Sequence, residues 1–281
     1  MGGLFQNGAC PLPEGWERGI SFQDTACLLP TVMGECPTCS DLKPTQRATT
    51  ETFRPVSLIT ALECSTFGGI DVQDVASKTL DETASYALAR EMLTGEASLR
   101  DANPNVEGPL GNPSLQGSAQ VVGDGSAGPV GALGCLEQRM MDATGGRRGV
   151  VLIGPAMAMY LGQNSLLHIE GDLLTGRLRT ISGTRVIVSG GFDGRAPFPD
   201  DSPGSPGDPC VPWNSTGAPG PGDQLYIYAV AALWAGVGPG RMLSDVDRAN
   251  NTASAREERP ALVAFTPCAT FAAPTGIPNP C

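Results

Sequence analysis

The segment NSLLHIEGD, residues 164–172, contains the single histidine of the chain, His168, with Ser165 and Asp172 close by. These three residue types form the relay of serine hydrolases, in which the histidine takes a proton from the serine. Known relays, however, join residues that are distant in sequence, and the nucleophile elbow G-x-S-x-G is absent. We therefore interpret His168 as a partly exposed, hydrogen-bonded histidine, with a hydrolase that uses His168 as the less favoured alternative.

The cysteine pair in CPTC, Cys36 and Cys39, has the spacing of half a zinc site, and Cys27 precedes it. A second C-x-x-C or a histidine pair, which would complete such a site, is missing. The chain has 9 cysteines, an odd number spread widely, which does not indicate a disulfide framework. We expect a turn with two ordinary thiols that oxidise later, if at all, and no metal site.

Other catalytic patterns are also missing. GVGPGR at 236–241 lacks the Lys-Ser end of a phosphate-binding loop. The chain has two pairs of adjacent acids, Asp200–Asp201 and Glu257–Glu258. Adjacent acids usually lie on solvated loops or on opposite faces of a strand, and neither position provides the buried environment that a general acid needs. The sequence therefore predicts no catalytic residue, no cofactor-binding residue, no metal ligand and no cofactor.

The charge of the chain argues against tight or sequence-specific DNA binding. Its formal net charge is −11, and the best basic cluster, GRRG at 146–149, has two arginines. Proteins that grip phosphates need clustered Lys and Arg. The N-terminus has no signal-peptide pattern, and no window approaches about 18 apolar residues. We expect a chain that is made in the cytosol and does not enter a membrane.

Apolar spacing predicts a mixed helix-and-strand chain, of one large domain or two closely joined ones. The longest predicted helix covers 71–94, with Asp71 as its N-cap and Gly95 as its stop. A second predicted helix ends at Gly145, and a third begins at Pro155. The predicted strands are GISFQDTACLL, the buried FRPVSLITALEC, GVVLIG, TRVIVSGG and a last pair, QLYIYAVAALWAGV and ASAREERPALVAFTPC.

This order of elements resembles the major capsid proteins of tailed bacteriophages, which have the Hong Kong 97-type fold that encapsulin shells also use. The most telling stretch is GRRGVVLIGPAMAMYLGQNSLLHIEGDLLTGRLRTISGTRVIVSGGFDG, in which an apolar strand precedes a short helix and then the strand RTISGTRVIVSGG, residues 179–191. LYIYAVAALWAGVG and VDRANNTASAREERPALVAFTPC are similar to the late strand and closing segment of actinobacterial phage structural proteins.

The resemblance implies an α+β fold with five parts. These are an N-terminal arm (1–25), an extended loop with the first peripheral strands (26–70), a peripheral domain (71–127) with a spine helix (71–94), an axial domain (128–240) with a long loop (191–224), and a C-terminal return to the peripheral domain (241–281). Some relatives crosslink a lysine of the extended loop, the region of Lys43, but we predict no crosslink here.

The resemblance also implies a function without catalysis. Copies would self-assemble as hexamers and pentamers into an icosahedral shell that encloses phage double-stranded DNA, in a virion assembled in the host bacterial cytoplasm. Scaffolding, portal and decoration proteins are possible partners, DNA would be enclosed without sequence-specific binding, and no membrane is involved. The alternatives are an encapsulin-like shell, another virion subunit of the same fold, or a small binding module suggested by the loop around Trp213.

Overall fold

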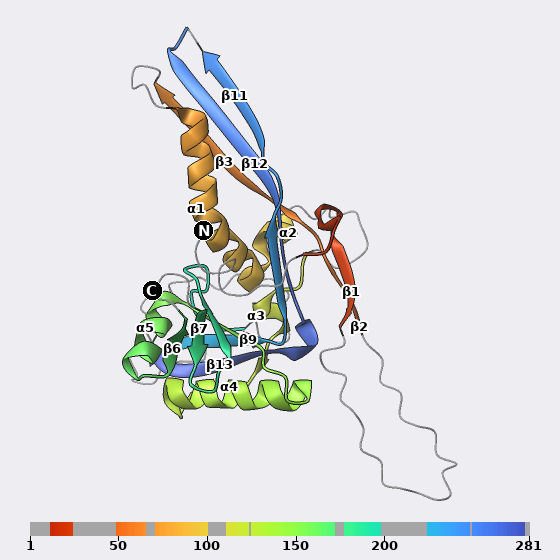
Figure 1. Ribbon diagram of the computed structural model, residues 1–281, viewed down its shortest axis with the longest axis vertical. Helices are drawn as coiled ribbons and strands as arrows, with labels where there is room; N and C mark the ends of the chain where they lie inside the picture. The colour runs from red at the N-terminus through yellow and green to blue at the C-terminus, as the bar shows by residue number, and fades with distance from the viewer. Residues whose placement is uncertain are drawn as a thin grey trace, which may run out of the picture.

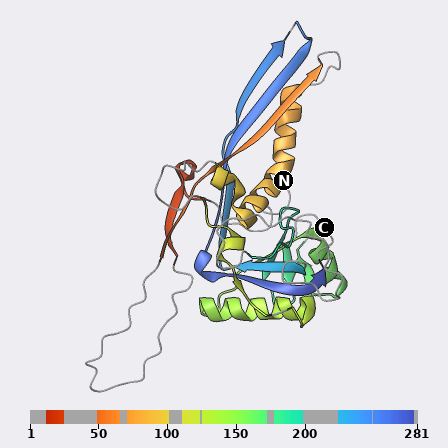
Figure 2. The ribbon, with the colours of Figure 1, turned by 180° about the vertical axis from the view of Figure 1, so that it is seen from behind.

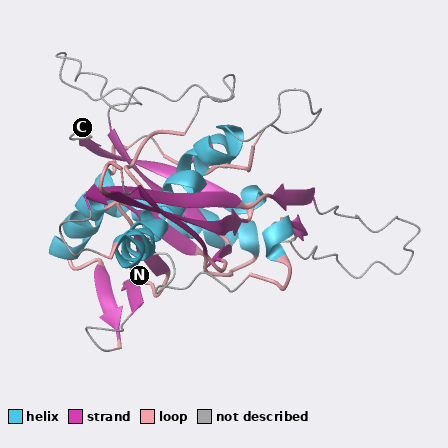
Figure 3. Cartoon of the chain, turned by 90° about the horizontal axis from the view of Figure 1, so that it is seen from above, coloured by secondary structure: helices cyan, strands magenta, loops and turns pink. Residues whose placement is uncertain are grey.

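The computed structural model describes residues 12–24, 49–65, 71–100, 111–123, 125–171, 177–197, 224–247 and 249–278. A long projection, which we call the blade, rises from a body built around a seven-stranded sheet (Figure 1). A hairpin of β1 (Ile20–Asp24) and β2 (Thr49–Phe53) stands to one side, as the view from above also shows (Figure 3).

The blade consists of one helix on one face of three antiparallel strands. Its elements are α1 (Val72–Thr94), β3 (Val56–Ser65), β11 (Arg241–Asp247) and the first half of β12 (Thr252–Phe265). β12 pairs with β3 and β11 in the blade, and its last five residues pair with β10 (Leu233–Val237). One strand therefore runs without a break from the blade into the body.

The body contains a mixed sheet in the order β4-β13-β9-β5-β8-β7-β6. Its strands are β4 (Gln120–Val121), β13 (Thr270–Pro278), β9 (Gln224–Val230), β5 (Val150–Ile153), β8 (Arg185–Val188), β7 (Arg177–Thr180) and β6 (Leu167–Glu170). The body helices are α4 (Gly128–Thr144) and α5 (Pro155–Gln163). The remaining helices are short: α2 (Glu96–Arg100), α3 (Leu115–Ser118), η1 (Trp16–Arg18) and η3 (Pro267–Ala269). α4 covers the sheet face that points away from the blade (Figure 2).

The predicted long helix is observed as α1, with its caps as expected. The Asp71 carboxylate accepts hydrogen bonds from the backbone N–H groups of Gln73 (3.0 Å) and Asp74 (3.2 Å), which satisfies two donors at the start of the helix. Gly95 ends it with φ of 69°, a left-handed conformation that glycine adopts without strain. α4 ends in the same way at Gly145, and α5 begins at Pro155, both as predicted.

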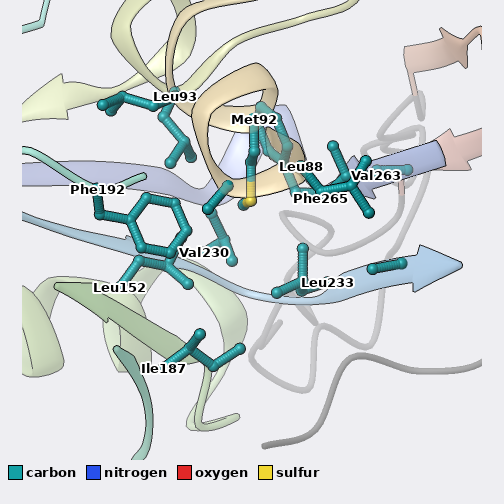
Figure 4. Packing of buried hydrophobic residues seen from close by; sticks show 14 of the residues in the cluster. Leu88, Met92, Leu93, Leu152, Ile187, Phe192, Val230, Leu233, Val263 and Phe265 are labelled. Atoms are coloured by element: carbon teal, nitrogen blue, oxygen red, sulfur yellow. The ribbon is translucent and has the colours of Figure 1, made fainter. Parts of the chain in front are cut away.

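The main core lies where the C-terminal half of α1 meets the body sheet. Figure 4 shows the helix residues above side chains from both sheets, and the residues it labels are Leu88, Met92, Leu93, Leu152, Ile187, Phe192, Val230, Leu233, Val263 and Phe265. A second core fills the opposite sheet face, under α4. Because both faces of β9 are covered, all seven of its residues are buried, which explains its nearly continuous apolar sequence.

The predicted single strand over 224–237 is wrong, because it forms two strands in different sheets. β9 and β10 are separated at Ala231 and Ala232, whose N–H groups donate to Ala269 O and to the Thr266 hydroxyl. The turn between β12 and β13 therefore takes the hydrogen bonds that a continuous strand would need. An apolar run does not reveal this break, since both halves are buried.

Three further strand predictions need correction. β3 is not a buried strand: only its first residues are buried, and the rest alternates because the far face of the blade is open. The strand predicted over 179–191 is interrupted after Thr180 by a turn. The predicted strand that contains β12 is not one of the last two strands of the chain, because β13 follows it. The sequence also did not predict β11, β7 and β6, since their short, charged sequences lack an apolar pattern.

Truncating Leu88 tests the packing of α1 on the body. This side chain is 0% exposed, so Leu88→Ala should lower the free energy of unfolding by about 2–5 kcal/mol. Leu243→Ala is the matched control, because Leu243 is 50% exposed on the open face of the blade, and we expect a loss below about 1 kcal/mol. Urea unfolding of unassembled chains, followed by circular dichroism, measures both. Equal losses would contradict the described core.

Candidate functional surfaces

The histidine segment does not assemble a catalytic relay in the described structure. His168 is exposed in β6 and lies directly opposite Arg179 of β7. Ser165 has a φ of 56° at the turn after α5, and Asp172 falls outside the described residues. The hydrogen bond expected for His168 is not found among the residues that the structure describes. His168 is therefore an exposed strand residue with a basic neighbour.

The described cysteines differ in their bonding. Cys268 is disulfide-bonded, whereas Cys64 and Cys135 are free thiols. Sequence spacing did not indicate this bond because a disulfide depends on which Cβ atoms the fold brings within about 4 Å. The thiols of Cys36 and Cys39 lie outside the described ranges. So do four other groups that the sequence singled out, namely Cys27, Lys43, Asp200–Asp201 and Trp213.

The described part of the chain holds no group of three or more His, Cys, Asp or Glu side chains arranged to bind a metal ion. Within that part, too, every helix is too short or too polar to cross a bilayer.

The two adjacent acids Glu257 and Glu258 lie on opposite faces of β12, as expected for neighbours in a strand. Glu257 faces α1 and is 5% exposed. Its Oε1 accepts a hydrogen bond from Arg259 Nε at 2.7 Å, and Arg259 also donates to Asp81 Oδ1 at 2.5 Å and to Ser77 Oγ at 3.0 Å. The hydrogen bond with Glu257, followed by that with Asp81, raises the pKa of the Arg259 guanidinium against the opposing effect of burial. We call Asp81, Glu257 and Arg259 the blade clamp.

The blade clamp sits where β12 leaves the body and enters the blade. Its acids come from both layers of the blade, Asp81 from the helix and Glu257 from the sheet, so Arg259 ties the two layers together. Gly240, at the turn between β10 and β11, lies directly over Glu257, and a Cβ there would collide with Glu257 Oε1. The clamp therefore joins α1 to β12 at the base of the blade, and the β10–β11 turn packs against it.

A second set of polar contacts joins α1 to the segment after β8. Arg90 NH1 lies 2.5 Å from Asp193 Oδ2, and Arg195 Nε lies 2.7 Å from the same oxygen. Gly191 packs so closely on α1 that a Cβ there would be 2.5 Å from Tyr86 O. These contacts join the C-terminal half of α1 to the segment that follows β8.

Glu91, also on α1, is buried at 4% exposure beneath the start of α2. Its carboxylate accepts hydrogen bonds from Ala97 N at 2.7 Å and Ser98 N at 3.1 Å, which caps α2. Burial raises the pKa of Glu91, and the hydrogen bonds from Ser98 and Ala97 offset only part of this effect.

The open face of the blade carries a shallow groove of about 530 Å³ between β3, β12 and β11. Glu63, Leu243, Asp245 and Arg256 are among the residues that line it. Small-molecule sites are usually concave pockets that enclose most of the ligand. The groove of the blade is open along the sheet and would not enclose a small molecule in this way.

Three solved structures share this arrangement. A chain from Gordonia phage Cozz is 13% identical, with a TM-score of 0.50 over 96% of this chain and 84% of its own. A chain from Mycobacterium phage Ogopogo is 16% identical, with a TM-score of 0.51 over 96% of this chain and 90% of its own. The capsid of an empty GTA particle is 11% identical, with a TM-score of 0.53 over 96% of this chain and 88% of that one. This chain has the Hong Kong 97-type capsid fold.

No family model matches the sequence, and neither does any curated protein. The capsid fold and its α+β class, predicted from the resemblance, are confirmed at the level of structure. The sequence missed the polar contacts that brace this fold, because they join residues as distant as Asp81 and Arg259. One signal was present: in AREER the strand alternation places Glu257 and Arg259 on the same face.

Breaking the blade clamp should destabilise the chain strongly. Arg259→Met leaves Glu257 buried without its cation, and we expect a loss of about 3–5 kcal/mol in the free energy of unfolding. Adding Glu257→Gln should restore part of the loss, since the buried charge is then gone. Arg256→Met is the matched control, because Arg256 lies on the exposed face of the same strand, and it should cost less than about 1 kcal/mol. A small loss in Arg259→Met would contradict the clamp.

Glu91 predicts a specific pH dependence of stability. Its pKa is raised in the folded chain, so its contribution to stability is fully present below the unfolded pKa and is lost as pH rises through the folded pKa. Between pH values of about 4 and 7, the stability of the wild type should therefore fall relative to that of Glu91→Gln. Urea unfolding at several pH values measures the difference, with Glu82→Gln, exposed on the same helix, as the control. A constant difference would contradict the buried carboxylate.

Proposed function

We propose that this chain is the major subunit of a phage capsid. Copies assemble as hexamers and pentamers into an icosahedral shell that encloses double-stranded DNA in the virion. The observation that carries the proposal is the fold similarity over 96% of the chain to the capsid of an empty GTA particle, with chains from two actinobacterial phages matching over the same share.

The contacts of the described residues support a structural role. The blade clamp and the Arg90–Asp193 ion pair hold blade and body in one orientation, and a shell subunit needs such rigidity to repeat its contacts around closed symmetry. We assign the blade, with α1 as its spine, to the peripheral domain and the sheet with α4 and α5 to the axial domain. Residues 241–281 return from the blade to the body sheet.

The charge and the partners follow from this role. With a net charge of −11, the chain suits a container that encloses DNA without gripping it, since tight phosphate binding would need clustered cations. Scaffolding, portal and decoration proteins are the partners that such a subunit would meet during assembly in the bacterial host cytoplasm. The role requires no cofactor and no catalytic group.

Negative-stain electron microscopy beside size-exclusion chromatography tests the proposal. Purified chains, alone or with the products of neighbouring genes, should form closed shells or rings of five and six subunits. His168→Ala should still form closed particles, because a shell subunit does not need a catalytic imidazole. A chain that stays a monomer or dimer under all these conditions would overturn the capsid function. Shells that copurify with a cargo enzyme instead of DNA would favour an encapsulin-like compartment.

A further inference from the structure

One face of the body sheet gathers basic side chains in an acidic protein. Arg179 of β7 lies directly opposite His168 of β6 and opposite Arg185 of β8. Residues directly opposite each other in a sheet point to the same face, and Arg177, two residues before Arg179, points there as well. We call these four residues, His168, Arg177, Arg179 and Arg185, the cationic face.

Arg179 and Arg185 of this face already have interaction partners. Glu170, opposite Arg177, forms an ion pair with Arg179 Nε. Arg177 and His168 are both exposed, and no carboxylate of the described residues lies within ion-pair distance of Arg177. The cationic face therefore presents the Arg177 guanidinium to solvent, although the chain as a whole carries −11.

The cationic face borders an open sheet edge. β6 is the last strand of the sheet, and in the described structure no strand pairs with its outer side. Such an edge offers backbone donors and acceptors to a partner. β6 and α5 lie at the end of the body away from the β1–β2 hairpin (Figures 1 and 2).

Apolar side chains are exposed around the same edge. Ile181, at the turn after β7, is 67% exposed, and its N–H donates to Leu166 O just before β6. Ile169 of β6 is 45% exposed on the opposite sheet face, and Met159 of α5 is 69% exposed. Arginine, methionine and other large apolar residues are typical of protein interfaces, whereas a phosphate backbone offers nothing for the apolar ones to contact. The combination favours a protein partner with an acidic surface.

The same chain offers such a surface. The blade carries six exposed carboxylates against three exposed cations, Lys78, Arg241 and Arg256; the carboxylates are those of Glu63, Asp71, Asp74, Glu82, Asp245 and Asp247. Among them, Asp74 is paired with Lys78, and both members of that pair are largely solvated. Blade and cationic face are thus of opposite charge on one molecule, so that a head-to-tail contact between copies would bring them together. Contacts of this heterologous kind close into rings when the rotation between copies allows it.

We propose that the β6 edge with its cationic face is a subunit contact that binds the acidic surface of a second copy of this chain. The inference rests on the proposed shell function and names the surface that joins neighbouring subunits. Charge complementarity mainly sets the association rate and excludes wrong partners, while the apolar residues around the edge supply buried area.

The test is an assembly assay with a graded series at Arg177, an exposed position. Arg177→Lys should assemble as the wild type does, Arg177→Gln should assemble less well, and Arg177→Glu should need about a tenfold higher protein concentration. Added NaCl should weaken wild-type assembly more than that of Arg177→Gln, because salt screens exposed charges. Arg139→Glu is the matched control, since Arg139 is exposed on α4 of the same body and undergoes the same change of charge.

Three results would overturn the inference while leaving the shell function intact. The first is normal assembly of the Arg177→Glu chain. The second is an equal defect in Arg139→Glu, which would reveal an effect of net charge alone. The third is normal assembly with lost binding of a labelled DNA duplex, which would assign the face to nucleic acid. A wild-type chain that never assembles would overturn the proposed function, and the inference with it. Circular dichroism and urea unfolding confirm that each variant is folded.

Discussion

The burial of one end of α1 is the constraint on which the other features depend. Leu88, Met92 and Leu93 lie against side chains from β12, β9 and β8, so the same helix that forms the blade also closes the main core of the body. A helix of 23 residues is much longer than this contact requires, and its other half projects beyond the body. The blade exists because the helix and β12 continue together past the core that anchors them.

The sequence predicted the parts of this design that depend on local chemistry. Asp71, Gly95, Gly145 and Pro155 marked helix ends correctly, because caps and breakers act within a few residues. The break between β9 and β10 was not predictable in this way, since its cause is a hydrogen bond from Ala232 to Thr266. Strands β6, β7 and β11 were missed because their charged residues show no apolar alternation.

The candidate surfaces likewise combine features that short segments predict with features that only the fold creates. Because the sequence has no catalytic motif around His168, we predicted no catalytic role for it. The structure places this residue at an exposed position opposite an arginine. A linear reading of charge found no cluster beyond Arg147 and Arg148, because the arginines of β7 and β8 are separated in the sequence by a turn. Only the register of the two strands places Arg179 and Arg185 side by side. Surface charge is thus a property of the sheet and is not visible in any short segment.

The continuity of β12 has a mechanical consequence. The strand rises about 3.3 Å per residue, so the portion between Arg259 and its start at Thr252 acts as a lever arm of about 23 Å. A rotation of about 5° at the base would move the tip by about 2 Å, close to half the spacing of neighbouring strands. Because the same strand enters the body core, a force on the tip of the blade is transmitted along β12 to Phe265 and its neighbours. A small change of angle near residue 259 is therefore amplified along the strand to the tip of the blade.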